Sequence, residues 1–319
     1  MRRAALALGL AFALATPAAA QSDPLLDQAR ARLDEASKEA DDSRRAALIS
    51  QARAAFEEFL KQNPDHPMAA QANVEIARIL ALQAKAKLSR ASRLEAADAR
   101  ALEIAKARPG FTQAMARYQE AIAALDARIK KLDEAKKEKE SPLSGELKRS
   151  KAQAELDAVV LQYELAMTHV GDDERKQRAE ALDKAAKAFD RLIGQYLDTR
   201  IGHLARVWSI QARYSMGTEE KAVAEMARFV SAHRPIREAA DAIRLAGYFG
   251  IQHTFETNLP KDTPAQKFQR TEKAADEWLR AYPDARNTPE GIGARYRLAL
   301  MKEQLALLEP NARYQGPKA

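Results

Sequence analysis

One ten-residue pattern occurs twice in the chain and constrains its fold more than any other feature. Residues 55–64 align without gaps to residues 274–283, and in both copies an Asp follows the final Pro. Two further segments, 185–198 and 222–235, keep the same apolar positions. The equivalent positions are Phe59, Leu192, Phe229 and Trp278, which lie 133, 37 and 49 residues apart. Spacings of about 20 to 50 residues are typical of helical solenoids, so the longest gap predicts an inserted element.

The inserted element is predicted to be a long helical hairpin over residues 111–171. Apolar residues alternate in steps of four and three through one segment, at Phe111, Met115, Tyr118, Ile122, Leu125, Ile129 and Leu132. A second such row runs from Ala152 to Val170, after a short turn at residues 141–145. This spacing is that of a coiled-coil seam, and a short connection between two such helices makes them antiparallel.

The composition agrees with an all-α fold. The 319 residues include only 12 Gly and 13 Pro, and almost no segment alternates with the period of two that strands require. Lys and Arg number 52 against 45 Asp and Glu, which gives a formal net charge of +7. The two signs are interspersed along the chain, as on solvated helix faces, so we expect no nucleic-acid partner.

The first twenty residues read as a secretory signal peptide. Two arginines precede an apolar run from Ala4 to Thr16, and small residues follow up to Ala20. Cleavage near Ala20 predicts a periplasmic or secreted protein, and no segment of the mature chain is long and apolar enough to span a membrane. The sequence contains no Cys, so it offers no thiol for lipid attachment, which argues against a lipoprotein.

The repeats resemble tetratricopeptide-repeat (TPR) proteins, especially their exported bacterial branch. Ala52, Phe56 and Pro64 fall on the family's Ala, Phe and Pro positions, and Gly217, Ala222 and Met226 fall on its Gly, Ala and aromatic positions. The resemblance is to periplasmic members such as the Tol-system coordinator and outer-membrane assembly factors. It implies a TPR-like solenoid of helical hairpins and a scaffold that binds proteins. The long hairpin departs from the standard repeat.

These patterns divide the chain into four parts. The signal peptide occupies residues 1–20, and N-terminal helices with a first TPR-like unit occupy residues 21–110. The long hairpin follows over residues 111–171, and C-terminal TPR-like repeats occupy residues 172–319. We expect this organisation to be that of a binding protein rather than of an enzyme.

The sequence offers little for catalysis or metal binding. Its five histidines lie at least 20 residues apart and form no metal-binding spacing. It contains no G-x-S-x-G, H-E-x-x-H or phosphate-binding glycine motif. We therefore predict a non-enzymatic chain with no cofactor, no bound metal and no catalytic residue.

The expected function is a protein-protein interaction scaffold of the periplasm or cell envelope. Trp208, Arg206, Arg213 and Tyr214 are candidate partner-binding residues, because aromatic and Arg side chains anchor bound peptides. The alternative for Trp208 is that it packs between helices, and Trp278 is expected to be packed. Two other functions stay open: an oligomerising coiled-coil spacer that self-associates through the hairpin, and a binder of acidic envelope polysaccharide.

Overall fold

The computed structural model describes residues 23–39, 41–92, 94–135, 142–257 and 262–308, and every regular element in these ranges is a helix. The predicted all-α class is therefore confirmed. The predicted signal peptide and its cleavage site lie outside the described residues. The chain forms two compact units, one ending at Tyr196 and the other beginning at Leu197. The four parts predicted from sequence patterns are not the same divisions as these two compact units, and the boundaries of the four parts stay predictions.

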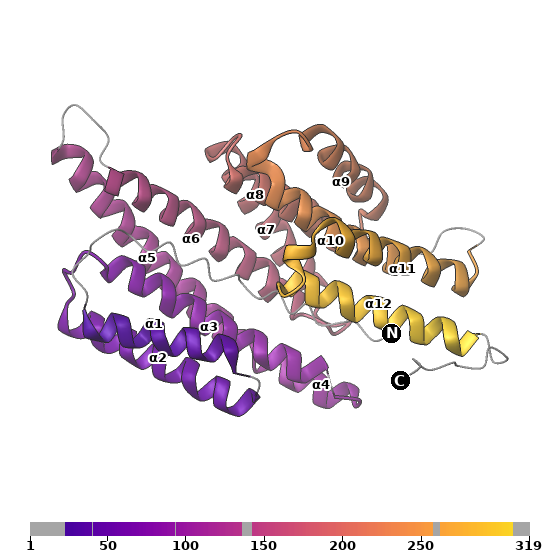
Figure 1. Ribbon diagram of the computed structural model, residues 1–319, viewed down its shortest axis with the longest axis horizontal. Helices are drawn as coiled ribbons and strands as arrows, with labels where there is room; N and C mark the ends of the chain where they lie inside the picture. The colour runs from indigo at the N-terminus through magenta and orange to yellow at the C-terminus, as the bar shows by residue number, and fades with distance from the viewer. Residues whose placement is uncertain (1–22, 40, 93, 136–141, 258–261, 309–319) are drawn as a thin grey trace. The chain divides into compact units, whose positions relative to one another are not determined.

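The first unit contains α1 (Pro24–Lys38), α2 (Asp42–Gln62), α3 (Ala69–Ser92), α4 (Ala97–Ala105), α5 (Arg108–Ala135), α6 (Pro142–Met167) and α7 (Arg175–Gln195) (Figure 1). Packing follows chain order, with α1 against α2, α2 against α3, α3 against α5, α5 against α6 and α6 against α7. Each helix is thus covered by its neighbours in sequence, as in a helical solenoid.

The helix boundaries of this unit follow local sequence signals, with one exception. The Asp23 carboxylate caps α1 by accepting from the Leu25 N–H at 2.9 Å, directly before Pro24. Pro109 and Gly110 read as a helix stop, but the structure places them in the first turn of α5. Proline is tolerated there because the first N–H groups of a helix lack partners, and a Cβ on Gly110 would lie 3.0 Å from the Ala84 Cβ. Gly110 therefore lets α5 approach α3 closely.

The predicted long hairpin exists as α5 and α6. The Lys151 Nζ lies 2.5 Å from Asp126 Oδ1 and the Lys148 Nζ lies 3.2 Å from Asp133 Oδ2, so residue numbers rise on one helix as they fall on the other. The helices are therefore antiparallel. A two-stranded coiled coil is not confirmed, because α5 also packs against α3 and α6 also packs against α7.

The second unit contains α8 (Arg200–Ser215), α9 (Glu219–His233), α10 (Ala240–Glu256), α11 (Pro264–Ala281) and α12 (Pro289–Leu308). Short 3₁₀ helices, η1 (Arg237–Ala239) and η2 (Pro283–Ala285), precede α10 and α12. The helices again pack with their neighbours, α8 with α9 and α10, α10 with α11, and α11 with α12. The helix α11 begins with a capping box, in which Thr263 and Gln266 exchange hydrogen bonds.

The repeat positions identified from the sequence lie in the cores. Phe59, Leu192, Phe229 and Trp278 are all 6% exposed or less. Trp278 is packed as expected, and its indole N–H donates to the Arg244 carbonyl at 2.9 Å. These side chains fill the space between successive helices, which is the role that the repeat pattern predicts.

Candidate functional site

The four residues that the sequence suggests for partner binding lie on α8. Trp208 and Tyr214 are each only 5% exposed. The Trp208 ring meets the edge of Phe249 with centroids 5.1 Å apart, and Tyr214 stacks on His253 at 3.7 Å. Both rings therefore pack α8 against α10, which was the alternative considered for Trp208.

Arg206 and Arg213 are half-buried on the same helix. Arg213 lies 3.9 Å from Glu225 of α9. Because the two aromatic rings point into the core, the structure does not gather the four side chains into one open surface. Partner binding at these positions stays a prediction. Of the four side chains, those of Arg206 and Arg213 are the ones accessible to a partner.

A buried polar cluster joins α8, α10 and α12 in the same unit. The His253 Nε2 lies 2.9 Å from the Gln211 Oε1, and Arg297, which is 5% exposed, donates to the Tyr248 hydroxyl at 3.1 Å. Burial, with a smaller contribution from Arg297, lowers the pKa of His253 to about 4, so this histidine is neutral at pH 7. Arg297 falls on the buried stripe of α12 with Ala294 and Met301, and helical periodicity is the sequence signal that locates it.

The first unit holds a larger set of buried charges, which we name the α3–α6 ladder: Glu75, Arg78 and Lys85 of α3 with Asp157 and Glu164 of α6. Arg78 Nε lies 3.5 Å from Asp157 Oδ2, and Lys85 Nζ lies 2.8 Å from Glu164 Oε1. Both ion pairs join residues 79 positions apart, so α3 and α6 run parallel with a constant register. Seven residues of helix separate the two rungs by about 10 Å.

The rung at Asp157 is fixed from three helices. Asp157 is 3% exposed and accepts hydrogen bonds from the Tyr118 hydroxyl at 3.2 Å and from Gln153 Nε2 at 2.7 Å. Arg78 Nη1 also donates to Glu75 Oε1 at 2.8 Å, so one guanidinium pairs two carboxylates. Burial, and then the Asp157 charge, raises the pKa of Tyr118, which keeps its hydroxyl protonated and able to donate.

Two ladder carboxylates are incompletely compensated. Burial raises the pKa of Glu75 and of Glu164, although Arg78 and Lys85 respectively oppose the rise. Within the described part of the chain, no hydrogen-bond donor reaches Glu75 Oε2, Glu164 Oε2 or the nearby Gln71 Oε1. Buried oxygens normally have partners, so these three atoms are exceptions within the described residues, and the raised pKa of Glu75 and Glu164 agrees with their incomplete compensation.

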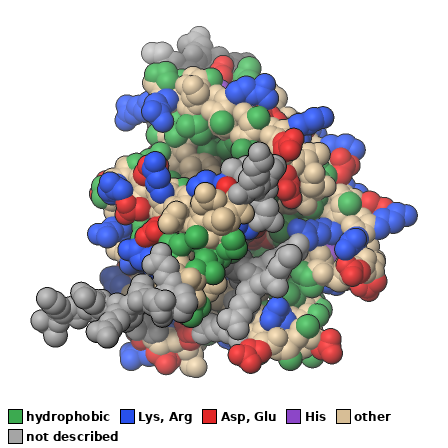
Figure 2. Space-filling model, turned by 90° about the vertical axis from the view of Figure 1, so that its right-hand side faces the viewer, with side chains coloured by type: hydrophobic (Ala, Val, Ile, Leu, Met, Phe, Trp, Pro, Cys, Tyr) green, Lys and Arg blue, Asp and Glu red, His purple; other side chains and the backbone are tan. Residues whose placement is uncertain are grey.

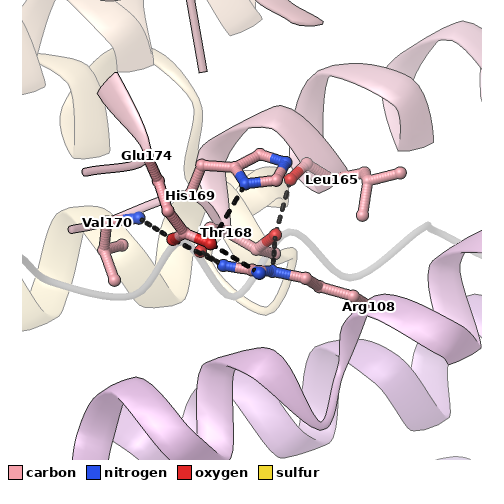
Figure 3. Close-up of polar contacts among 6 residues, drawn as sticks. All are labelled: Arg108, Leu165, Thr168, His169, Val170 and Glu174. Carbon is pink, nitrogen blue, oxygen red and sulfur yellow. Dashed lines mark hydrogen bonds and ion pairs between the residues drawn. The ribbon is translucent and has the colours of Figure 1, made fainter. Parts of the chain in front are cut away.

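A separate polar contact holds the end of the hairpin together (Figure 3). The Arg108 guanidinium at the start of α5 makes two contacts of 2.7 Å with the Glu174 carboxylate and donates to the Thr168 carbonyl at 2.9 Å. The Val170 N–H also donates to Glu174 at 3.2 Å. Hydrogen bonds from Arg108 lower the pKa of Glu174 to about 2. The contact fixes the connection from α6 to α7 and is structural.

The described residues offer no metal-binding group of three or more His, Cys, Asp or Glu side chains. No helix in the described ranges has the length and apolar character needed to cross a membrane. On the face shown in Figure 2, Lys and Arg side chains alternate with Asp and Glu instead of forming a patch of one sign. This mixture agrees with the interspersed charges of the sequence.

Comparison with known families adds one finding. Residues 171–313 match the model of the YfiO family, described as outer membrane lipoprotein. The match covers just under half of the 319 residues. No curated protein matches the chain. With its all-helical structure, the matched segment confirms that the chain resembles TPR-like scaffold proteins of the bacterial envelope.

Proposed function

We propose that this chain is a non-enzymatic protein-interaction scaffold of the bacterial periplasm or cell envelope. The observation that carries the proposal is the match of residues 171–313 to a family described as outer membrane lipoprotein. Stacked helices expose long faces, and solenoids use such faces to bind other proteins. The exported location that the sequence predicts agrees with this role.

The lipid in the family description does not extend to this sequence. None of the 319 residues is Cys, so they contain no thiol to which a lipid could be attached. The proposal therefore concerns protein binding in the envelope and is independent of lipid attachment. The accessible guanidinium groups of Arg206 and Arg213 are proposed to contribute to partner binding.

Affinity capture from solubilised envelope fractions tests the proposal. The tagged chain should enrich a small set of envelope proteins that stay bound at high salt, whereas an unrelated exported helical protein should not enrich them. Loss of every protein at stringent salt would contradict the scaffold function. Sedimentation of the purified chain tests the spacer alternative, because self-association that disappears on removal of residues 130–151 would identify α5 and α6 as an oligomerising rod.

A further inference from the structure

The helix α12 carries a row of exposed apolar side chains. Ile292, Tyr296 and Leu307 are 49%, 58% and 69% exposed, and Ala299 and Ala306 lie exposed between them. The steps of four, three and seven residues from Ile292 to Ala306 follow one side of a helix, and Leu307 borders that side. We name these five residues the α12 stripe. A contiguous exposed apolar row of this kind marks an interaction site.

The opposite side of α12 is already covered. Ala294, Arg297 and Met301 are buried where α12 packs on α10 and α11 (Figure 1). Among the described residues ten large apolar side chains are exposed, and four of them belong to α12. A helix that is apolar on both sides is normally covered on both, so the α12 stripe needs a partner that the described residues do not supply.

We propose that the α12 stripe binds the same stripe of a second copy of this chain. Such a pair has two-fold symmetry, so the same surface is used by both copies and each contact occurs twice. The two α12 helices then run antiparallel, with Ala299 at the centre of the contact. The proposal concerns self-association and does not depend on the scaffold function.

Three exposed charges border the α12 stripe. Arg295, Lys302 and Glu303 form no ion pair with another described residue. The residues three and four positions from each of them are uncharged, so the helix cannot pair these charges internally. Unpaired charges of both signs beside an apolar row fit a partner surface that carries the same mixture.

The positions of these charges make the stripe complementary to itself. In an antiparallel pair centred on Ala299, residues at equal distances before and after Ala299 lie opposite each other. Arg295 and Glu303 are each four positions from Ala299, so the guanidinium of each copy faces the carboxylate of the other. Tyr296 and Lys302 are each three positions away, which places an ammonium beside an aromatic ring. This charge complementarity between identical surfaces favours a second copy as the partner.

The apolar residues fit the same arrangement. Ile292 and Ala306 are each seven positions from Ala299, so they also face each other. Ala299 itself lies at the two-fold axis, where a small side chain lets two helices approach closely. The segment that follows α12 offers less cover, because residues 309–319 contain one large apolar side chain, Tyr314, with two prolines and one glycine.

Sedimentation velocity of the purified chain tests the proposal. A contact of one helix per copy is small, and small interfaces are weak, so we expect a monomer–dimer equilibrium with a Kd of about 10–100 µM. The sedimentation coefficient should rise as the chain is concentrated through this range. Tyr296→Ser should weaken dimerisation about tenfold, because both copies lose the ring. Leu102→Ser of α4 is the control, since Leu102 is equally exposed at 58% and lies outside the stripe.

An exchange of charges tests the register of the two helices. Arg295→Glu and Glu303→Arg should each weaken dimerisation about tenfold, because like charges then face each other at two places in the dimer. An equimolar mixture of these two variants should dimerise as the unaltered chain does, since each variant supplies the charge that the other needs. In about 1 M salt the separate variants should differ little from the unaltered chain, because exposed charges are screened. Circular dichroism melting checks that each variant folds.

Three results would overturn the proposal. One is a chain that stays monomeric at every concentration. Another is self-association that Tyr296→Ser and Arg295→Glu leave unchanged but that removal of residues 130–151 abolishes, which would assign it to α5 and α6. The third is dimerisation that appears only after removal of residues 309–319, which would assign the stripe to that segment of the same chain.

Discussion

The Glu174 carboxylate makes the free energy of unfolding of the first unit depend on pH. Its pKa of about 2 lies below the ordinary value of 4.5 because Arg108 holds the ionised form. The stabilisation is therefore complete above about pH 5 and is lost as the pH falls through 4.5 towards 2. We expect Glu174→Gln to lower the free energy of unfolding by about 1–2 kcal/mol at pH 7, less than the full pKa displacement because water partly screens the pair.

Chemical denaturation at several pH values measures this effect. The difference between the Glu174→Gln variant and the unaltered chain should shrink as the pH falls from 4.5 towards 2, and it should approach zero only below pH 2, where Glu174 is protonated in both the folded and the unfolded chain. Glu120→Gln is the control, since Glu120 lies on an exposed helix face, where it pairs with Arg117 of the same helix at 2.9 Å. A loss of stability that is equal at pH 7 and pH 2 would show that packing, and not charge, is responsible.

Individual side chains were the hardest feature to predict from the sequence. Nothing in the local sequence marks positions 75, 78 and 85 of α3 as buried, because α6 lies far away in sequence and its register with α3 is not visible there. Trp208 was a candidate for partner binding, but its ring packs on Phe249, also from another helix. Contacts between distant helices decide whether a charged or aromatic residue is buried, and local patterns do not contain them.

At the scale of the element, replacing either of two helix glycines in the second unit by alanine should change its stability in opposite directions. A Cβ on Gly293 of α12 would lie 2.4 Å from the Tyr248 hydroxyl and 3.0 Å from its ring. That ring is buried and its hydroxyl accepts from Arg297, so it cannot easily move. Gly293→Ala should therefore cost about 2–3 kcal/mol through overpacking.

The matched substitution is Gly250→Ala in α10, where a Cβ would meet nothing within 4 Å. It should stabilise the unit by about 0.5–1 kcal/mol, because alanine favours the helix and restricts the unfolded chain. Thermal unfolding of both variants compares the two effects directly. Equal changes of the same sign would show that α12 does not pack on Tyr248 as described.

Helix positions followed the sequence closely where capping and periodicity agreed. Asp23 before Pro24 is a local signal for the start of α1, and the repeated pattern around Trp278 lies on α11. The helix end that Pro109 and Gly110 suggest lies a few residues earlier, at Ala105, and Pro109 itself stands in the first turn of α5, because proline is equally compatible with that position. The seam of α5 was correctly recognised as apolar, but sequence alone did not show that its buried face is shared by α3 and α6.

At the scale of the whole molecule, the chain forms two compact units, and it passes from the first to the second between Tyr196 and Leu197. The second unit has a core of its own, with Trp208, Phe229, Phe249 and Trp278 all 5% exposed or less. We expect a fragment of residues 197–313 to be helical and to unfold cooperatively when produced alone. Circular dichroism melting measures this, and a gradual transition without cooperativity would show that the unit needs the rest of the chain.

The all-α class was predictable because repeats, low glycine content and helical periodicity agree with one another. The binding surface could not be predicted from the sequence, since it depends on which helix faces remain uncovered after packing. The family match of residues 171–313 and the signal peptide expected at residues 1–20 are what point to the envelope.

Photo-cross-linking in envelope fractions tests the scaffold function most directly. A cross-linking amino acid is placed at Arg206 or Arg213 of α8, or at the control position Glu120 of α5. The account predicts defined adducts with envelope proteins from Arg206 and Arg213 and none from Glu120. The absence of adducts from both Arg206 and Arg213, in chains shown to be folded, would contradict it.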